Sequence, residues 1–234
     1  MKKRSKKYRA AAESFNRAET HTLTDAIRIL KGFPSAKFEE SVDLNVQLGI
    51  RPDQSSESVR GTVALPHGTG RKVRVLCFAK GEAEREAKQA GADFIGGEDY
   101  VKKVLEGWLE FDAVVAHPDM MREISKLGKV LGPRGLMPTP KTGTVTATVG
   151  AAIKEIKSGR VEFKNDKTGG LHVNIGKRSF AEEQLLTNAK TVIRAVLDAK
   201  PAAAKGDYLK RVTVSATQGP GIRLRSTPMG VVES

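Results

Sequence analysis

Hydrophobic and polar residues alternate most regularly between residues 41 and 50. The apolar positions of this alternation are Val42, Leu44, Val46, Leu48 and Ile50. A period of two is typical of a β-strand that buries one face and leaves the other in water. A second strand is expected at residues 59–65, after a polar loop.

The segment from residue 72 to residue 157 follows a different pattern. Short apolar runs predict strands at residues 72–79, 93–95 and 113–116. Between and after them, apolar residues at helical spacing predict helices at residues 82–90, 98–108, 118–127 and 150–157. Strands that alternate with helices in this way are typical of a small parallel sheet covered by helices.

Hairpin-like patterns return after Gly159. Two strands, 160–163 and 171–175, are expected around a turn, and further strands are expected near 208–217 and 222–224. A capping box at Ser179 predicts a helix that ends near residue 199. Near the N-terminus, residues 8–17 predict a short helix, and Thr24 is expected to cap a second one.

We therefore predict a mixed fold of the α/β and α+β classes with two domains. Residues 1–67 and 159–234 would form a split α+β domain, and residues 68–158 would form an inserted α/β domain. One continuous fold with an irregular sheet remains the alternative.

Net charge narrows the possible partners. The chain has 234 residues and a formal charge of +13, which indicates nucleic acid or an anionic membrane surface. Residues 1–67 and 159–234 together carry +10 of this charge.

No apolar run approaches the roughly 18 residues of a membrane span, and no apolar region follows the basic start MKKRSKKYR, so neither a membrane span nor a signal peptide is predicted. Aromatic residues make up only 5%, which favours structured RNA over extended stacking on single strands.

One loop in the middle of the chain is strongly cationic. Residues 126–144 contain three prolines and four glycines, and no acidic residue occurs between Glu123 and Glu155. Its cations are Lys126, Lys129, Arg134 and Lys141. We expect no helix or central strand in this segment and a contact to a polyanion, with a solvated surface loop as the alternative.

No sequence motif of an enzyme or of a metal site is complete in this chain. The glycines of residues 68–70 precede a predicted strand, although a dinucleotide fingerprint must open a helix. The segment GLHVNIGK at 170–177 has one residue too many for a P-loop, and Arg178 stands where Ser or Thr would bind magnesium. The four histidines are scattered, and Cys77 lies in an apolar run. We predict no catalytic residue, no metal site and no cofactor.

Two other classes of function stay open at this point. The α/β segment could bind a nucleotide or sugar phosphate as an enzyme, or the chain could be an exported protein that coats DNA or a membrane. The second is weaker, because no signal peptide or basic amphipathic helix supports it. Phe38 likewise has two interpretations, as an RNA contact beside Lys37 or as a core aromatic ahead of its strand.

Several long segments resemble the universal L-one ribosomal protein family, whose members lie at the mobile stalk of the large subunit. The segments are SAKFEESVDL (35–44), VRGTVALPHGTG (59–70), GADFIGGED (91–99), GPRGLMPTPKTGTVT (132–146), FKNDKTGGLH (163–172) and TQGPG (217–221). The resemblance implies an RNA-binding domain built from both chain ends and an inserted Rossmann-like domain reached through a two-strand hinge.

The same resemblance implies the function. Members bind a structured junction of large-subunit ribosomal RNA, assist release of deacylated tRNA from the exit site, and repress their own operon by binding its mRNA. It implies a cytoplasmic, ribosome-associated protein without cofactor or membrane contact, and we expect a monomer when RNA is absent.

The resemblance also implies the positions that contact RNA. They are Lys37, Phe38, Asp166, Lys167, Thr168, Thr217, Gln218 and Gly219. Gln218 departs from the family, which usually has methionine there, so a hydrogen-bonding amide replaces a thioether. The cationic loop is then expected to make a secondary RNA contact through Arg134 and Lys141.

Overall fold

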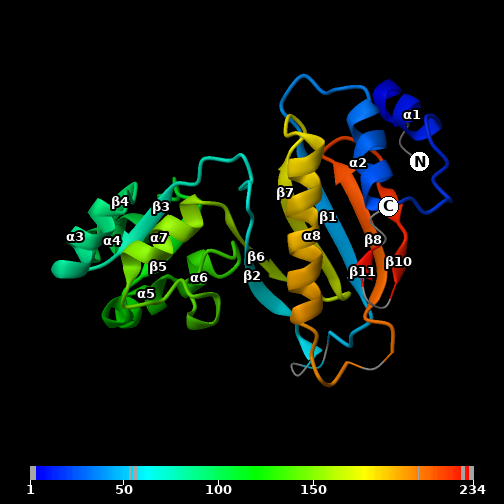
Figure 1. Cartoon of the computed structure of the whole chain (residues 1–234). Coiled ribbons are helices and arrows are strands. Elements are labelled where there is room, and N and C mark those ends of the chain that lie inside the picture. The colour runs from blue at the N-terminus through cyan, green and yellow to red at the C-terminus, as the bar shows by residue number, and fades with distance from the viewer. Residues whose placement is uncertain (1–3, 53, 55–56, 205, 228–229, 232–234) are drawn as a thin grey trace. The chain divides into compact units, whose positions relative to one another are not determined.

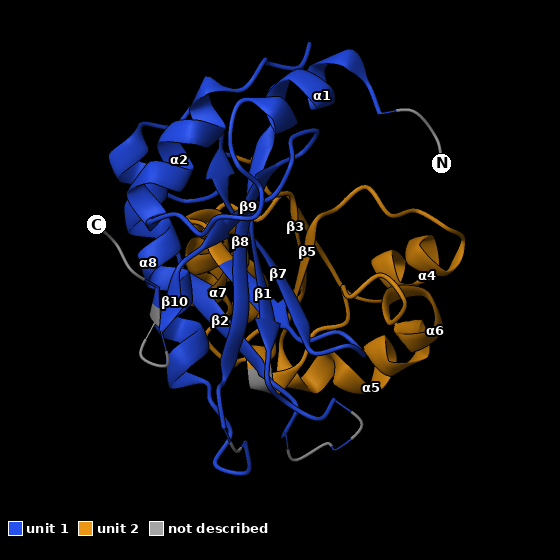
Figure 2. Ribbon diagram, turned by 90° about the vertical axis from the view of Figure 1, so that its right-hand side faces the viewer, with its two compact units in different colours: residues 1–70, 161–234 blue, residues 71–160 orange. Residues whose placement is uncertain are grey.

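The computed structural model describes residues 4–52, 54, 57–204, 206–227 and 230–231 (Figure 1). It divides into two compact units, unit 1 with residues 1–70 and 161–234, and unit 2 with residues 71–160 (Figure 2). Both units combine helices with sheets, which confirms the predicted mixed α/β class. The first three residues of the basic N-terminal segment lie outside the described residues.

Unit 1 is built on a four-stranded antiparallel sheet. Its strands are β1 (Ser41–Leu48), β7 (Gly170–Lys177), β8 (Leu209–Ala216) and β9 (Ile222–Leu224), in the order β7-β1-β8-β9. Leu44 of β1 lies opposite Val173 of β7 and Val214 of β8. The even-numbered residues of β1 are buried and the odd-numbered ones are partly exposed, as the alternation predicts.

Helices cover one face of this sheet. They are α2 (Leu23–Gly32) and α8 (Glu182–Asp198), which pack against each other and against the strands. The shorter α1 (Lys6–Glu13) contributes Ala11 to the same core. Two short strands, β10 (Ser226–Thr227) and β11 (Gly230–Val231), pair with each other. The opposite face of the sheet is left to the polar half of each strand.

Three local predictions in unit 1 are wrong. The cap of α2 is Thr22 rather than Thr24, and its hydroxyl accepts from the Asp25 N–H at 3.2 Å. Helix α8 begins after Ala181, whose N–H donates to Gln184 Oε1, while Ser179 donates instead to Glu39 at 2.5 Å. Helix α1 also begins and ends earlier than residues 8–17.

The expected hairpin around residues 165–170 is also wrong. Strand β6 (Arg160–Lys164) pairs with β2 (Arg60–Ala64) in a separate two-stranded sheet, whereas β7 pairs with β1. The two strands that flank the turn therefore belong to different sheets. β1 and β7 have eight residues each and β6 has only five, so pairing with β1 satisfies more backbone hydrogen bonds of β7 than pairing with its neighbour in sequence would.

Unit 2 contains three parallel strands. They are β3 (Val75–Phe78), β4 (Phe94–Gly96) and β5 (Ala113–Ala116), in the order β4-β3-β5. Helices α3 (Glu82–Gln89) and α7 (Val149–Lys157) pack on a cluster with Val75 and Cys77. Helix α4 (Glu98–Leu105) packs on a second cluster, with Leu76 and Phe78. Alternate residues of β3 thus serve different clusters.

The cationic loop is partly helical, which corrects the expectation for residues 126–144. Helical turns continue through η2 (Pro118–Met120), α5 (Met121–Ile124), η3 (Ser125–Leu127) and α6 (Gly128–Leu131), and a further turn forms at η4 (Pro140–Thr142). Ile124, Leu127 and Leu131 are fully buried, and their spacing of three and four residues places them on one helical face. Their burial outweighs the glycine content up to residue 131. Of the described helices, none combines the length and apolarity needed to cross a membrane.

Candidate nucleic-acid interface

The residues expected to contact RNA in unit 1 lie at the two ends of β1. Residues 37–38 lead into β1, and residues 217–219 follow β8, which runs antiparallel to β1 and ends beside its start. We call this edge the first end. Residues 166–168 precede β7 and lie beside the end of β1, which we call the second end. An eight-residue strand separates the two ends by roughly 24 Å.

Phe38 is a surface residue at the first end. Its side chain is 51% exposed, and Lys37 beside it is exposed as well. The interpretation of Phe38 as a core aromatic is therefore wrong, and Phe33 fills the core position instead. An exposed aromatic ring next to a cation can pack against a nucleoside while the ammonium meets a phosphate.

The turn after β8 is exposed at Thr217 and Gln218, and Thr217 also hydrogen-bonds to the start of β1. The Thr217 hydroxyl accepts from the Ser41 N–H at 3.0 Å, and the Thr217 N–H donates to the Ser41 carbonyl at 3.1 Å. The Gln218 side chain is exposed. Gly219 closes the turn by donating to the Ala216 carbonyl at 3.0 Å. The Thr217 side chain is exposed but engaged in holding the turn, whereas the exposed Gln218 side chain makes no such contact to β1.

Asp166 organises the turn at the second end. Its Oδ1 accepts from the Thr168 N–H and hydroxyl, at 2.7 and 2.8 Å, and from the Gly170 N–H at 2.7 Å. These hydrogen bonds, that of Gly170 first, lower the pKa of Asp166 below its ordinary value. Gly169 has φ of +80°, which only glycine adopts readily. The result is a fixed turn that leaves Lys167 exposed.

A polar sheet face connects the two ends. Its side chains alternate with the buried ones and are Asp43, Asn45, Gln47, His172, Asn174, Arg211, Thr213, Ser215 and Arg223. The register places His172, Asn45, Thr213 and Arg223 in one row across the four strands. We call these residues the polar face. None of them was among the expected RNA contacts, although the polar half of the 41–50 alternation contained the signal for Asp43, Asn45 and Gln47.

Hydrogen bonds order the polar face. Asn45 donates to Ser215 Oγ at 3.1 Å, and its Oδ1 lies 2.7 Å from His172 Nδ1. Gln47 donates to the Thr168 carbonyl at 2.7 Å and so ties the face to the second end. A shallow hollow of about 190 Å³ lies here, lined in part by Arg211. Fixed donors and acceptors between cations suit sugar hydroxyls and phosphates.

Unit 2 contains the two secondary candidates. Arg134 is exposed in the turn after α6. Lys141 lies in η4, and its side chain is outside the described part of the structure. The RNA contact of these two residues stays a prediction.

The strand ends of unit 2 are unsuited to phosphate. Helices that follow parallel strands bind phosphate through their positive N-termini, but α3 begins with Glu82 and Glu84, and α4 begins with Glu98 and Asp99. Lys80 between them is paired with Glu98 at 2.9 Å. These carboxylates already satisfy the helix dipoles and would repel an anion.

Two further observations concern the single cysteine and the possible metal ligands among the described residues. Burial raises the pKa of the Cys77 thiol to about 12, so it is protonated and unreactive at neutral pH. Within the described residues, no group of three or more His, Cys, Asp or Glu side chains could hold a metal ion.

Comparisons with known proteins agree with the resemblance. The model of the ribosomal protein L1p/L10e family matches residues 30–220. The large ribosomal subunit protein uL1 of Kosmotoga olearia is 52% identical over 224 residues, which cover 96% of this chain and 97% of that protein. The chain therefore belongs to the ribosomal protein L1p/L10e family and is a non-enzymatic component of the large ribosomal subunit in the cytoplasm that binds its ribosomal RNA.

Proposed function

We propose that unit 1 is the RNA-binding domain and that its polar face, with both ends, binds a structured junction of the ribosomal RNA at the mobile stalk. The observation that carries this proposal is the gathering of three distant stretches, residues 37–38, 166–168 and 217–219, around one exposed sheet face. Unit 2 is then an inserted Rossmann-like domain.

The side chains divide between direct contact and support. Lys37 and Lys167 meet phosphates, Phe38 packs against a nucleoside, and the Gln218 amide hydrogen-bonds to a base or sugar. Asp166, Thr168 and Thr217 act mainly by holding the turns, because hydrogen bonds within the fold already engage their oxygen atoms. Gly219 supports contact by closing the turn against the Ala216 carbonyl.

Two further roles follow from the same interface. We propose that the chain assists release of deacylated tRNA from the exit site, and that it represses its own operon by binding a mimic of the junction on the mRNA. Arg134 and Lys141 of unit 2 add a secondary contact to the ribosomal RNA. The chain is a monomer in the absence of RNA.

A competition experiment tests the shared site. The full chain is bound to the labelled ribosomal junction, and the operon leader or a plain duplex of equal length is added as competitor. We expect the leader to compete and the duplex to compete poorly. Equal competition by the duplex would show charge-driven binding only, and failure of the leader alone would remove the autoregulatory role.

A matched pair of variants locates the site. Phe38→Ala in unit 1 should weaken binding to the junction, whereas Leu105→Ala in unit 2 should leave it unchanged. Both residues are large apolar side chains that are about half exposed, so general loss of apolar surface is controlled. Equal effects of the two substitutions would contradict the placement of the site in unit 1.

A further inference from the structure

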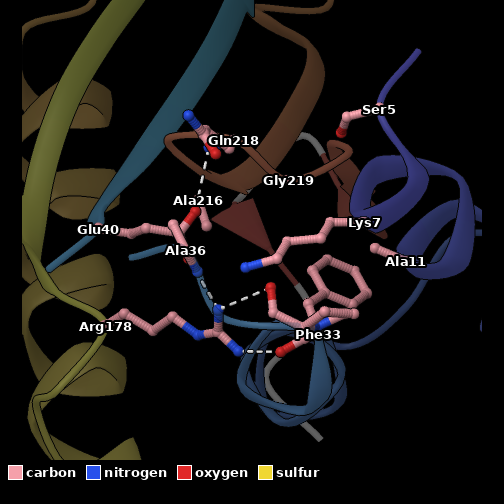
Figure 3. A pocket seen from close by; sticks show the side chains of 11 residues that line it. Ser5, Lys7, Ala11, Phe33, Ala36, Glu40, Arg178, Ala216, Gln218 and Gly219 are labelled. Atoms are coloured by element: carbon pink, nitrogen blue, oxygen red, sulfur yellow. Dashed lines mark hydrogen bonds and ion pairs between the residues drawn. The ribbon is translucent and has the colours of Figure 1, made fainter. Parts of the chain in front are cut away.

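A buried ion pair lies directly beneath the first end (Figure 3). Arg178 Nη1 and Glu40 Oε2 are 2.8 Å apart, and their side chains are only 14% and 4% exposed. The Arg178 N–H also donates to the Glu40 carbonyl at 2.9 Å. Burying two charges is unfavourable unless further hydrogen bonds satisfy them, so the remaining partners of this pair explain its role.

Glu40 connects the two segments expected to contact RNA at this end. Its carboxylate accepts from the Gln218 N–H at 3.2 Å and from the Ala36 N–H at 3.4 Å. Burial raises the pKa of Glu40, but hydrogen bonds from Arg178, Gln218 and Ala36 outweigh burial, and the pKa lies below its ordinary value. One ionised carboxylate therefore holds the segment before β1 to the turn after β8.

Arg178 holds the other end of the segment that carries Phe38. Its Nη2 donates to the Lys31 carbonyl at 3.0 Å and to the Phe33 carbonyl, and its Nη1 reaches the Pro34 carbonyl at 3.4 Å. The guanidinium thus satisfies carbonyl groups that α2 leaves without a partner at its C-terminus. Its donors are directed into the protein rather than toward solvent.

The space beside the pair does not accommodate a ligand. The cavity there measures about 20 Å³ and is lined by Phe33, Ala11 and Gly219 as well as by the pair. Lys7 closes it from α1 and donates to the Ser35 carbonyl at 2.5 Å. A nucleoside is far larger than this cavity, so the cluster is a packed junction of chain segments.

We propose that Glu40 and Arg178 are positioning residues, which fix residues 34–39 against residues 217–219 so that Phe38 and Gln218 form one surface before RNA arrives. Neither side chain contacts RNA. This inference rests on the proposed function of the first end. In a protein without the ion pair, both segments must become ordered when RNA binds. The free energy needed for this ordering weakens affinity, although no phosphate contact is lost.

The first test separates positioning from direct contact. The full-length variants Glu40→Gln and Arg178→Met are compared with Glu162→Gln, which breaks the more exposed Arg60–Glu162 pair elsewhere in unit 1. We expect each of the first two to weaken binding to the ribosomal junction about tenfold, as loop ordering is lost, and the control to change it little. The slope of log affinity against log salt should stay that of the unsubstituted chain. A slope reduced by about 0.7–0.9 for Arg178→Met would mean a lost phosphate contact and would overturn the proposal.

A double-mutant cycle tests the connection to Phe38. If Glu40 places the ring, Phe38→Ala should weaken binding clearly less in the Glu40→Gln background than in the unsubstituted chain. Additive losses would show that Glu40 acts independently of Phe38 and would overturn the inference. Amide hydrogen exchange in the same variant should rise at Ala36 and Gln218 and stay unchanged at Leu44, which excludes general unfolding.

Two controls keep the outcome decisive. If Glu40→Gln does not fold, Arg178→Lys replaces it in the cycle, because lysine keeps the charge but can serve fewer of the carbonyl groups. An unsubstituted chain that binds the junction no better than a duplex would overturn the proposed function and this inference together. Normal binding with additive variants would overturn the positioning role alone.

Discussion

The two units use their sheets in opposite ways. Unit 1 leaves one face of an antiparallel sheet polar and accessible, whereas unit 2 buries both faces of its parallel strands against helices. Only an antiparallel sheet commonly keeps a face in water. The strand direction therefore decides which unit can offer a broad surface to RNA, and unit 2 is left with loops and helix ends.

The cations on the polar face and its two ends differ from several cations of unit 2 in whether they form ion pairs. In unit 2, Arg74 pairs with Asp112, Lys157 with Asp93 and Arg160 with Glu155. In the part of unit 1 that the structure describes, Lys37, Lys167, Arg211 and Arg223 form no ion pair with an acid. Paired cations stabilise the fold locally, whereas unpaired ones raise the potential at the surface and attract phosphates.

The largest expected effect tests whether the units are energetically separate. Leu44→Ala removes a fully buried side chain from β1 and should lower the free energy of unfolding of unit 1 by about 2–5 kcal/mol. Trp108 is the single tryptophan and lies in unit 2, so its fluorescence reports that unit alone. Circular dichroism should show an earlier transition while the fluorescence transition stays in place. A joint shift would mean that the units unfold together.

The next effect concerns the aromatic contact. Phe38→Ala should reduce RNA affinity by roughly 1–3 kcal/mol, as loss of packing against a nucleoside would, and filter binding measures it. Its thermal stability should change little, because the ring is half exposed. Lost folding with unchanged affinity of the folded fraction would return Phe38 to a structural role.

A single phosphate contact should produce a smaller change. Lys167→Ala should weaken binding and reduce the salt slope by about 0.7–0.9. Lys88→Ala, which removes an exposed cation from α3 of unit 2, is the matched control and should keep the slope. Identical slopes for the two variants would show that the second end does not meet a phosphate.

The secondary contact should be weaker still. Arg134→Ala combined with Lys141→Ala is expected to reduce affinity less than Phe38→Ala does, because these cations belong to unit 2. Titrations of the ribosomal junction at one salt concentration give the ranking. A loss as large as that of Phe38→Ala would reverse the assignment of principal and secondary sites.

The smallest expected effect is on the stability of unit 1 at acidic pH, compared between the unsubstituted chain and Glu40→Gln. The folded-state pKa of Glu40 lies below its ordinary value of 4.5, so the unfolded chain binds the proton more tightly. The stability from ionised Glu40 is then complete above about pH 4.5 and is lost as pH falls through the folded pKa. Chemical unfolding of unit 1 across this range should depend less on pH in Glu40→Gln. The same pH dependence in both proteins would assign the effect to other carboxylates.

Local sequence patterns were enough to predict the strands whose apolar residues recur at a regular spacing or in one short run. β1 and β5 lie where the apolar positions placed them, since each pattern is complete within a few residues. The helical turns at 128–131 were missed because glycine and proline suggested an irregular loop, while Leu131 is held by partners outside that window. Pairing of β6 with β2 joins residues about a hundred positions apart, which no local pattern encodes.

The residues of the candidate site also differ in whether a local sequence pattern could have revealed them. The polar face could have been found from the alternation of β1, but only the sheet order shows that His172 and Arg223 share a row with Asn45. Glu40 and Arg178 are separated by 138 positions, and each resembles a solvated charge in the sequence. Their pairing depends on the fold that brings β7 beside β1.

Unit 2 is inserted between β2 and β6, and this position makes it a replaceable part of the chain. The chain leaves unit 1 after β2 and returns to it through β6, and these strands are hydrogen-bonded neighbours. A domain with nearby termini can be gained, exchanged or deleted at such a point without disturbing the host sheet. A single in-frame replacement of residues 71–160 would therefore let a protein engineer graft a different module at the same place.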